Sequence, residues 1–241
     1  MKPSRPSDIP LRPDESIDEF MDGRLKLIQS RKGYRFSIDA ILLSEFVSTK
    51  AGDLVVDLGT GCGIIPLILL LTRPVRFVCG LEVQTALAHQ ALRNALLNGF
   101  AHKMGVVTGD IKHPPITPFS TDVVVCNPPY RQAHSGRVNP DLQRAIARHE
   151  MLASLNDILN TSKRLLKAKG RLAMIYPAVR LADILARMRG FDLEPKRVRL
   201  IYPSVESEAK LVLIEASSGG RGGLQVLPPL IDQGDFSIIW T

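Results

Sequence analysis

The most regular feature of the chain is an alternation between short apolar runs and longer segments with helical periodicity. The short runs predict buried strands at residues 54–57, 77–82, 104–107 and 122–126. Between them, apolar positions three or four residues apart predict helices that begin near Ile64 and Thr85, and a long amphipathic helix over residues 151–169. Strands that alternate with helices are typical of a parallel sheet covered on both faces. We therefore predict an α/β fold from Asp53 onward.

The remaining segments predict less regular structure at the two ends. Residues 1 to about 16 are rich in proline and are expected to be extended. Residues 17–20 predict a short helix or turn, and 24–29 an alternating strand. Ser37 or Asp39 is suited to cap a helix with an apolar face. Toward the other end we expect a strand at 171–176, a helix at 181–188, and strands at 195–202 and 210–216.

These predictions divide the chain into three parts. Residues 1–50 form an N-terminal extension with a capping strand and helix, residues 51–216 form the main α/β domain, and residues 217–241 form a C-terminal tail. At 241 residues with 45% hydrophobic composition, the chain is long enough to bury a full core. Within the helix that begins at Thr85, the expected inner face consists of Ala86, Leu87, Ala91, Ala95 and Leu96.

Charge and targeting signals restrict the class of partner. The chain has 31 Lys and Arg against 24 Asp and Glu, a net charge of +7. Such a surplus favours an anionic partner, most commonly nucleic acid. No apolar run approaches the ~20 residues that span a bilayer, and the N-terminus lacks the apolar segment of a secretory signal. We expect a cytoplasmic protein with no membrane partner.

Three cysteines, Cys62, Cys79 and Cys126, lie in apolar or glycine-rich sequence. They show no C-x-x-C spacing and no accompanying histidine cluster. We expect small buried side chains in a reducing compartment, and no metal site.

A glycine-rich turn follows the first strand of the main domain. In the segment from Leu58 to Gly63, glycines occupy every second position, so the backbone can bend and approach a ligand closely. This predicts a nucleotide or nucleoside cofactor. The spacing differs from the dinucleotide fingerprint, and Asp57 precedes the first glycine by two residues. A carboxylate there repels a pyrophosphate and attracts a cation such as an amino group or a sulfonium.

Polar residues also follow the next strands. Glu82 ends the second strand about 20 residues beyond the glycines, the spacing at which an acid accepts ribose hydroxyls. Asp110 follows the third strand and is suited to an adenine amino group. Asn127, Pro128, Pro129 and Tyr130 follow the fourth, where the two prolines end the strand abruptly. This tetrapeptide supplies an amide, rigid carbonyls and an aromatic face, which suit a flat group bearing nitrogen.

The ordered set of motifs resembles a known family. The segment 57–63 with Glu82, Asp110 and Asn127-Pro128-Pro129-Tyr130 resembles the class I S-adenosylmethionine (SAM)-dependent methyltransferases that methylate amines. Residues 32–43 are similar to those of the bacterial tRNA1(Val) adenine-37 N6-methyltransferase family, and residues 135–140 and 147–150 resemble its bacterial relatives. The resemblance covers most of residues 24 to 230.

The resemblance implies a Rossmann-like fold, a cofactor and a set of site residues. The sheet would have seven mostly parallel strands with helices on both faces, and the strands at 195–202 and 210–216 would form its reversed terminal pair. The cofactor would be SAM, with no metal. The residues implied to hold it are Asp57, Gly59, Thr60, Gly61, Gly63, Glu82, Asp110 and Asn127.

The resemblance also implies the roles of the catalytic segment. The catalytic set would be Asn127, Pro128, Pro129 and Tyr130. The Asn127 side chain and the Pro128 carbonyl would accept the hydrogens of the target amine in hydrogen bonds, and Tyr130 would stack on the base. Catalysis would consist mainly of positioning. The basic residues that follow, Arg131, Arg137 and Arg148, would contact the phosphates of an RNA substrate, expected to be tRNA.

Three functions stay open at this point. The first is methylation of an adenine N6 amine in RNA. The second is methylation of another amine, either a guanine N2 or a protein glutamine amide, because glutamine methyltransferases share the Asn-Pro-Pro-Tyr motif. Those enzymes have a separate helical N-terminal domain, for which the segment before Asp53 is too short. The third is a SAM-binding RNA-associated factor without turnover.

Overall fold

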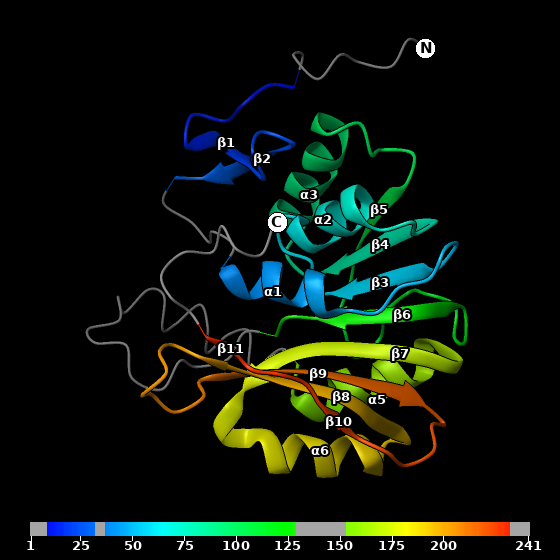
Figure 1. The fold of residues 1–241 in the computed structure, drawn as a ribbon. Coiled ribbons are helices and arrows are strands. Elements are labelled where there is room, and N and C mark those ends of the chain that lie inside the picture. The colour runs from blue at the N-terminus through cyan, green and yellow to red at the C-terminus, as the bar shows by residue number, and fades with distance from the viewer. Residues whose placement is uncertain (1–8, 32–36, 129–152, 232–241) are drawn as a thin grey trace.

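A computed structural model describes residues 9–31, 37–128 and 153–231 (Figure 1). Its main body is a twisted sheet with helices on both faces, and a separate two-stranded sheet lies beside α3. The predicted α/β class is confirmed. The expected count of seven strands is approximate, since two short strands near the C-terminus bring the sheet to nine.

Five parallel strands form one half of the main sheet. In spatial order they are β5 (Met104–Thr108), β4 (Phe77–Glu82), β3 (Leu54–Leu58), β6 (Thr121–Cys126) and β7 (Leu166–Pro177). The chain starts at β3, moves outward to β4 and β5, and then returns to β6 on the other side of β3. This reversal of direction is the point at which open α/β sheets bind their ligands, at the carboxyl ends of the strands.

The other half of the sheet contains one reversed strand. The strand β9 (Leu211–Ser218) pairs antiparallel with β7 and with β8 (Leu193–Tyr202). Because β8 is antiparallel to β9, it has the same direction as the five parallel strands. The expected reversed pair is therefore wrong in one respect, since β9 alone is reversed.

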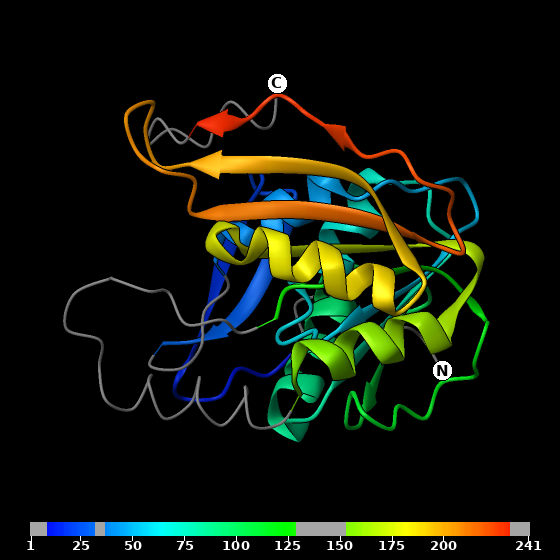
Figure 2. The same cartoon turned by 90° about the horizontal axis from the view of Figure 1, so that it is seen from below.

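Helices cover the two faces of the sheet. The helices α1 (Ile38–Phe46), α2 (Ile64–Thr72) and α3 (Thr85–Leu97) lie on one face, and α5 (Leu155–Leu165) and α6 (Leu181–Gly190) lie on the other (Figures 1 and 2). A short 3-10 turn, Ala178–Arg180, links β7 to α6. Each face has its own cluster of buried apolar residues.

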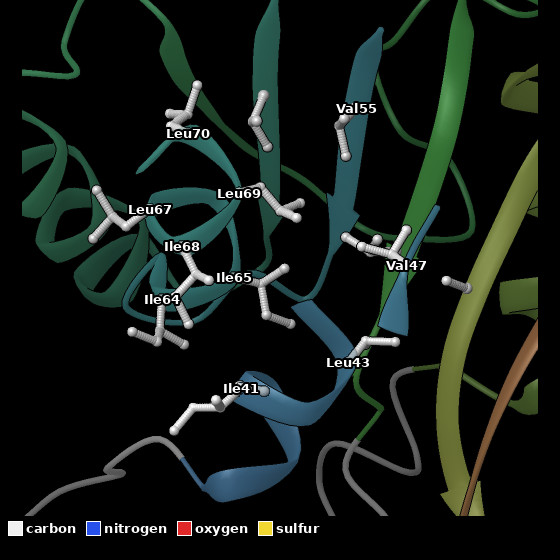
Figure 3. Packing of buried hydrophobic residues seen from close by; sticks show 14 of the residues in the cluster. Ile41, Leu43, Val47, Val55, Ile64, Ile65, Leu67, Ile68, Leu69 and Leu70 are labelled. Atoms are coloured by element: carbon white, nitrogen blue, oxygen red, sulfur yellow. The ribbon is translucent and has the colours of Figure 1, made fainter. Parts of the chain in front are cut away.

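The helix α2 has no polar face because it is buried on all sides. Every residue from Ile64 to Leu70 is buried, because α2 lies between the sheet, α1 and the neighbouring helix α3 (Figure 3). Ile41 and Leu43 of α1 and Val55 of β3 belong to the same cluster. Burial of this face fixes the first turn of α2, and with it the glycine-rich turn that precedes it.

The N-terminal extension differs from its prediction. Residues 17–20 are neither helix nor turn: they belong to β1 (Glu15–Phe20), which pairs antiparallel with β2 (Leu25–Ser30). Residues 21–24 connect the two strands, and Met21, Asp22 and Gly23 have the positive φ values that are common in hairpin turns. The strand pairing, which residues 17–20 alone do not reveal, decides the structure of this segment.

The long helix predicted over residues 151–169 is also shorter than expected. Within the described residues, α5 ends at Leu165, and β7 begins at Leu166, which pairs with Thr121 of β6. An irregularity in the β6 to β7 pairing follows, and Lys169 has a φ of +61°. The helical periodicity is overridden because Leu166 is buried and pairs with Thr121 in the sheet.

The buried face of α3 differs in part from the prediction. Ala91 and Ala95 are buried as expected, whereas Ala86 is exposed. The buried face also contains two polar residues, Gln90 and Asn94. A buried asparagine in a helix needs polar partners, and Asn94 finds them in the backbone of Ile28 and Cys62.

The C-terminal tail extends the sheet beyond β8. The strands β10 (Gln225–Val226) and β11 (Leu230–Ile231) both pair in parallel with β8, and the Leu227 amide donates to the Val198 carbonyl at 2.8 Å. The tail thus returns toward the carboxyl end of β8 (Figure 2). Across the described parts of the chain, no helix combines the length and apolarity needed to cross a membrane.

A matched pair of valines tests the packing of the sheet. Val124 of β6 is fully buried, whereas Val179 is 88% exposed. We expect Val124→Ala to lower the free energy of unfolding by about 2–3 kcal/mol, because it removes buried methyl groups and leaves a cavity. Val179→Ala should change it by less than about 0.5 kcal/mol. Urea unfolding of both variants measures the difference, and equal effects would contradict the position of β6 in the core.

Candidate functional site

The register of the sheet brings four strand ends together. Leu58 pairs with Leu81 on one side and with Cys126 on the other, and Leu81 pairs with Val107. These four residues form one row across β5, β4, β3 and β6. Adjacent strands lie about 4.8 Å apart, so the row spans about 14 Å. The residues that directly follow the row therefore lie side by side at the carboxyl edge: Thr108, Glu82, Gly59 and Asn127.

The glycine-rich turn after β3 is held close to β4. The amides of Gly59 and Thr60 both donate to the Leu81 carbonyl, at 2.8 and 3.0 Å. Gly59, Gly61 and Gly63 have φ values of +77°, +56° and +86°, which glycine adopts without strain. A Cβ on Gly63 would lie 2.8 Å from Met104 and 3.1 Å from Ala91, whereas a Cβ on Gly59 would meet open space. The lack of a side chain at Gly63 thus allows the turn to pack closely against α3 and β5. The lack of a side chain at Gly59 leaves the edge of β3 open to a ligand.

Glu82 is buried at the end of β4 and holds the same turn. One carboxylate oxygen accepts from the Gly61 amide at 2.9 Å, and the other accepts from the Gln84 amide at 2.9 Å. Each carboxylate oxygen can accept a second hydrogen bond. Glu82 can therefore orient the glycine turn and still accept hydroxyl donors from a ligand.

Asp57 has an unusual electrostatic environment. Its side chain is 1% exposed, and neither carboxylate oxygen has a hydrogen-bond partner. Burial raises its pKa to about 7, the Thr60 hydroxyl opposes this shift, and the negative charge of Glu82 reinforces it. A buried carboxylate without a partner is costly, and a ligand with a positive charge removes this cost.

Asp110 follows β5 at the far side of the row. One of its oxygens accepts from the Lys112 amide at 2.9 Å, which closes a short turn. The second oxygen stays available to a ligand that reaches this end of the edge. The side chain is only partly buried, unlike those of Asp57 and Glu82.

Only part of the predicted catalytic segment lies within the described residues. Asn127 directly follows β6 and is partly exposed, and Pro128 is buried. Asn127 is thus the neighbour of Gly59 at the carboxyl edge. The remaining predicted site residues lie outside the described residues: Pro129, Tyr130, Arg131, Arg137 and Arg148.

Asn94 also contacts the glycine turn, although no sequence motif marks it as a site residue. This fully buried side chain donates to the Cys62 carbonyl at 2.9 Å. Its position could have been noticed in the sequence, because Asn94 lies on the same face of the helix as Ala91 and Ala95. A polar residue on a buried face needs a buried hydrogen-bond partner. Gly80 is also unmarked by any motif, and a Cβ there would lie 2.6 Å from the Thr60 side chain.

The cysteines near the site are not arranged for reaction or metal binding. Cys62 and Cys126 are buried and Cys79 is partly buried, all three as free thiols. Burial raises the pKa of Cys62 to about 11 and that of Cys126 well above its usual value. In the described part of the chain, no group of three His, Cys, Asp or Glu side chains is placed to hold a metal ion.

The residues at this edge fit SAM. Asp57 offers an unpaired buried carboxylate to a cationic group, and Glu82 offers acceptors to ribose hydroxyls. Gly59 leaves room for close approach of a ligand to the backbone, and Asp110 is available to an adenine amino group. The sheet order and the fit of these residues to SAM indicate a class I SAM-dependent methyltransferase.

Comparison with known proteins gives the family. The sequence model of the methyltransferase small domain family matches residues 37–187, which is more than half of the chain. The chain belongs to this family, and its cofactor is SAM. The matched range contains α1, the glycine turn, all four strand ends and α5.

Curated relatives cover most of the chain. A protein of Porphyromonas gingivalis is 30% identical over 206 residues, which are 82% of this chain and 80% of that protein. A protein of Parabacteroides distasonis is 29% identical over 181 residues, 75% of each. Both relatives have the name tRNA1(Val) (adenine(37)-N6)-methyltransferase.

Solved structures agree with the fold. A predicted O-methyltransferase from Agrobacterium tumefaciens superimposes with a TM-score of 0.66 and 22% identity, covering 81% of this chain and 88% of that one. The geranyl diphosphate C-methyltransferase of Streptomyces coelicolor, solved with S-adenosyl-L-homocysteine, has a TM-score of 0.53 and 18% identity, covering 74% and 78%. At these identities the likeness shows the fold alone.

The raised pKa of Asp57 predicts pH-dependent cofactor binding. The carboxylate is the form that attracts a cation, and it is lost as the pH falls through about 7. We expect the affinity for SAM to weaken as the pH falls from 8 to 6. In this range Asp57 of the free protein takes up a proton, which it must release when SAM binds. Calorimetry in two buffers of different ionisation enthalpy measures the released proton. An affinity that is constant from pH 6 to 8 would contradict this assignment.

Asp57→Asn provides the matching stability test. Both folded and unfolded chains are protonated at this position below pH 3.8, and both are charged above about pH 7. Ionising Asp57 is costly only in the folded state, where the carboxylate is buried away from water. The free energy of unfolding without cofactor therefore falls as the pH rises between these two values. We expect Asp57→Asn to stabilise the free protein at pH 8 by on the order of 2 kcal/mol and by much less near pH 4. Thermal unfolding at the two pH values checks this difference.

Proposed function

We propose that this chain transfers the methyl group of SAM to the N6 amine of an adenine in tRNA. Two observations support the proposal together. The curated relatives that cover three quarters or more of the chain are named for this reaction at adenine 37 of tRNA1(Val). Asn127 also follows the strand next to the glycine turn, at the edge where the cofactor site lies. Position 37 of tRNA1(Val) is therefore the first target to test.

The position of Asn127 and Pro128 suggests how the chain orients the amine. The Asn127 side-chain oxygen and the Pro128 carbonyl are both acceptors, and they would accept hydrogen bonds from the two N–H groups of the exocyclic amine. The nitrogen lone pair would then stay free to accept the methyl group. Bound SAM supplies a methyl group on a positively charged sulfur. The chain contributes orientation and exclusion of water, so the rate gain would come mainly from positioning.

The remaining site residues are proposed to bind RNA. Tyr130 would stack on an adenine that has left its neighbours in the loop, with Pro129 holding the turn. Arg131, Arg137 and Arg148 would contact phosphates, consistent with the net charge of +7. A tRNA substrate also supports the proposal that the protein works in the cytoplasm.

The substrate is tested by labelling. The purified protein is incubated with SAM labelled in its methyl group and an unmodified transcript of tRNA1(Val), and the nucleosides are then separated. We expect label in N6-methyladenosine, and none in a matched transcript in which guanine replaces the adenine at position 37. Label at another adenine would correct the position. Label only in ribosomal RNA or in protein would overturn the proposed substrate.

Asn127→Ala tests the proposed chemical role. Loss of the acceptor should lower methyl transfer by about a hundredfold or more, because the amine is no longer oriented. SAM affinity should change by less than about threefold, since the glycine turn, Asp57 and Glu82 stay intact. Asn160→Ala, an exposed position on α5, is the matched control and should transfer at the normal rate. Normal transfer by Asn127→Ala would remove Asn127 from the mechanism.

A further inference from the structure

The N-terminal hairpin is attached to the main domain by two asparagines on α3. Asn94 accepts from the Ile28 amide at 2.7 Å and donates to the Ile28 carbonyl at 3.2 Å. One turn later, Asn98 accepts from the Lys26 amide at 2.8 Å and donates to the Lys26 carbonyl at 2.7 Å. Each side-chain amide therefore bonds one residue of β2 through both its backbone groups, as a neighbouring strand would.

The spacing explains why two asparagines can replace a strand. Lys26 and Ile28 lie two residues apart on β2, a distance of about 6.8 Å along a strand. Asn94 and Asn98 lie four residues apart on α3, about 6 Å along a helix axis. The two spacings nearly match, so the side chains of α3 satisfy the edge of β2 that faces away from β1 (Figure 1).

An ion pair adds to this attachment. The Arg93 guanidinium contacts both carboxylate oxygens of Glu15 on β1, at 2.7 and 2.8 Å. Glu15 is 5% exposed, and its hydrogen bond to Arg93 holds its pKa below the usual value. The hairpin is thus bonded to α3 through both of its strands.

Asn94 and Asn98 differ in the partner of their third hydrogen bond, which for Asn98 is the Asn94 carbonyl within α3, at 2.8 Å. The Asn94 amide nitrogen instead donates to the Cys62 carbonyl in the glycine turn, at 2.9 Å. The neighbouring Gly61 amide is held from the β4 side by Glu82. The turn that approaches the cofactor is therefore fixed by one side chain from β4 and by one from α3, and the latter also binds the hairpin.

We propose that Asn94 is a positioning residue that couples docking of the N-terminal hairpin to SAM binding. A docked hairpin completes the hydrogen bonds of Asn94, and the Asn94 amide then holds the Cys62 carbonyl in the conformation that accepts the cofactor. By linkage, bound SAM stabilises the docked hairpin by the same factor. The hairpin would then belong to the cofactor-binding machinery, although it lies outside the four strand ends whose residues fit the cofactor.

A pair of alanine variants separates coupling from simple stability. Asn94→Ala and Asn98→Ala each lose the bonds to one residue of β2, but only Asn94→Ala loses the bond to the glycine turn. We expect Asn94→Ala to weaken SAM binding about tenfold, and Asn98→Ala by less than about threefold. Calorimetric titration with SAM measures both dissociation constants. If Asn94 is merely structural, its variant lowers the melting temperature and leaves SAM affinity within twofold of normal, which overturns the proposal.

Hydrogen exchange of the unmodified protein gives an independent test. The Ile28 amide bonds Asn94 directly, so its exchange rate reports hairpin docking. We expect saturating SAM to slow this exchange about tenfold, matching the loss of affinity in Asn94→Ala. Unchanged exchange at Ile28 with SAM bound would overturn the coupling, even if the variant fails to fold. Both tests use SAM binding alone, so failure to methylate tRNA would refute the proposed substrate without affecting them.

Discussion

The structure depends on the parallel pairing of β3 with β4 and β6. This pairing places Leu58 beside Leu81 and Cys126, so that the residues following three strands separated by 20 or more positions in the chain meet at one edge. The apolar residues of the strands are buried on both faces by helices, which makes a shift in register costly. The geometry of the cofactor site is therefore a consequence of packing in the sheet.

Two different kinds of residue make up the site. Glu82, Gly63 and Asn94 maintain the shape of the glycine turn through backbone hydrogen bonds and close packing. Asp57 does the opposite, since it keeps a buried carboxylate without a partner in the free protein. A cationic ligand would remove this cost, and local rules are often broken in this way at functional sites.

The hairpin shows how a polar helix face can replace a strand. The inner stripe of α3 begins with alanines that allow close contact with the glycine turn and continues with asparagines that bond β2. The buried Asn94 and the partly exposed Asn98 each use both the oxygen and the nitrogen of the side-chain amide to bond β2, so they add specificity to the docking of the hairpin. The same helix thus connects the cofactor turn and the N-terminal extension.

The sequence by itself determined the α/β class, the central strands, the glycine turn, and Asp57, Glu82, Asp110 and Asn127 as strand-end residues. These features depend on local patterns: apolar runs, glycine spacing and the residues that end strands. Tertiary structure alone decided that residues 17–20 form a strand, that α5 ends at Leu165, that β9 alone is reversed, and that Asn94 bonds both β2 and the glycine turn. Each of these depends on partners distant in the chain, and such pairing overrides the local preference of a short segment.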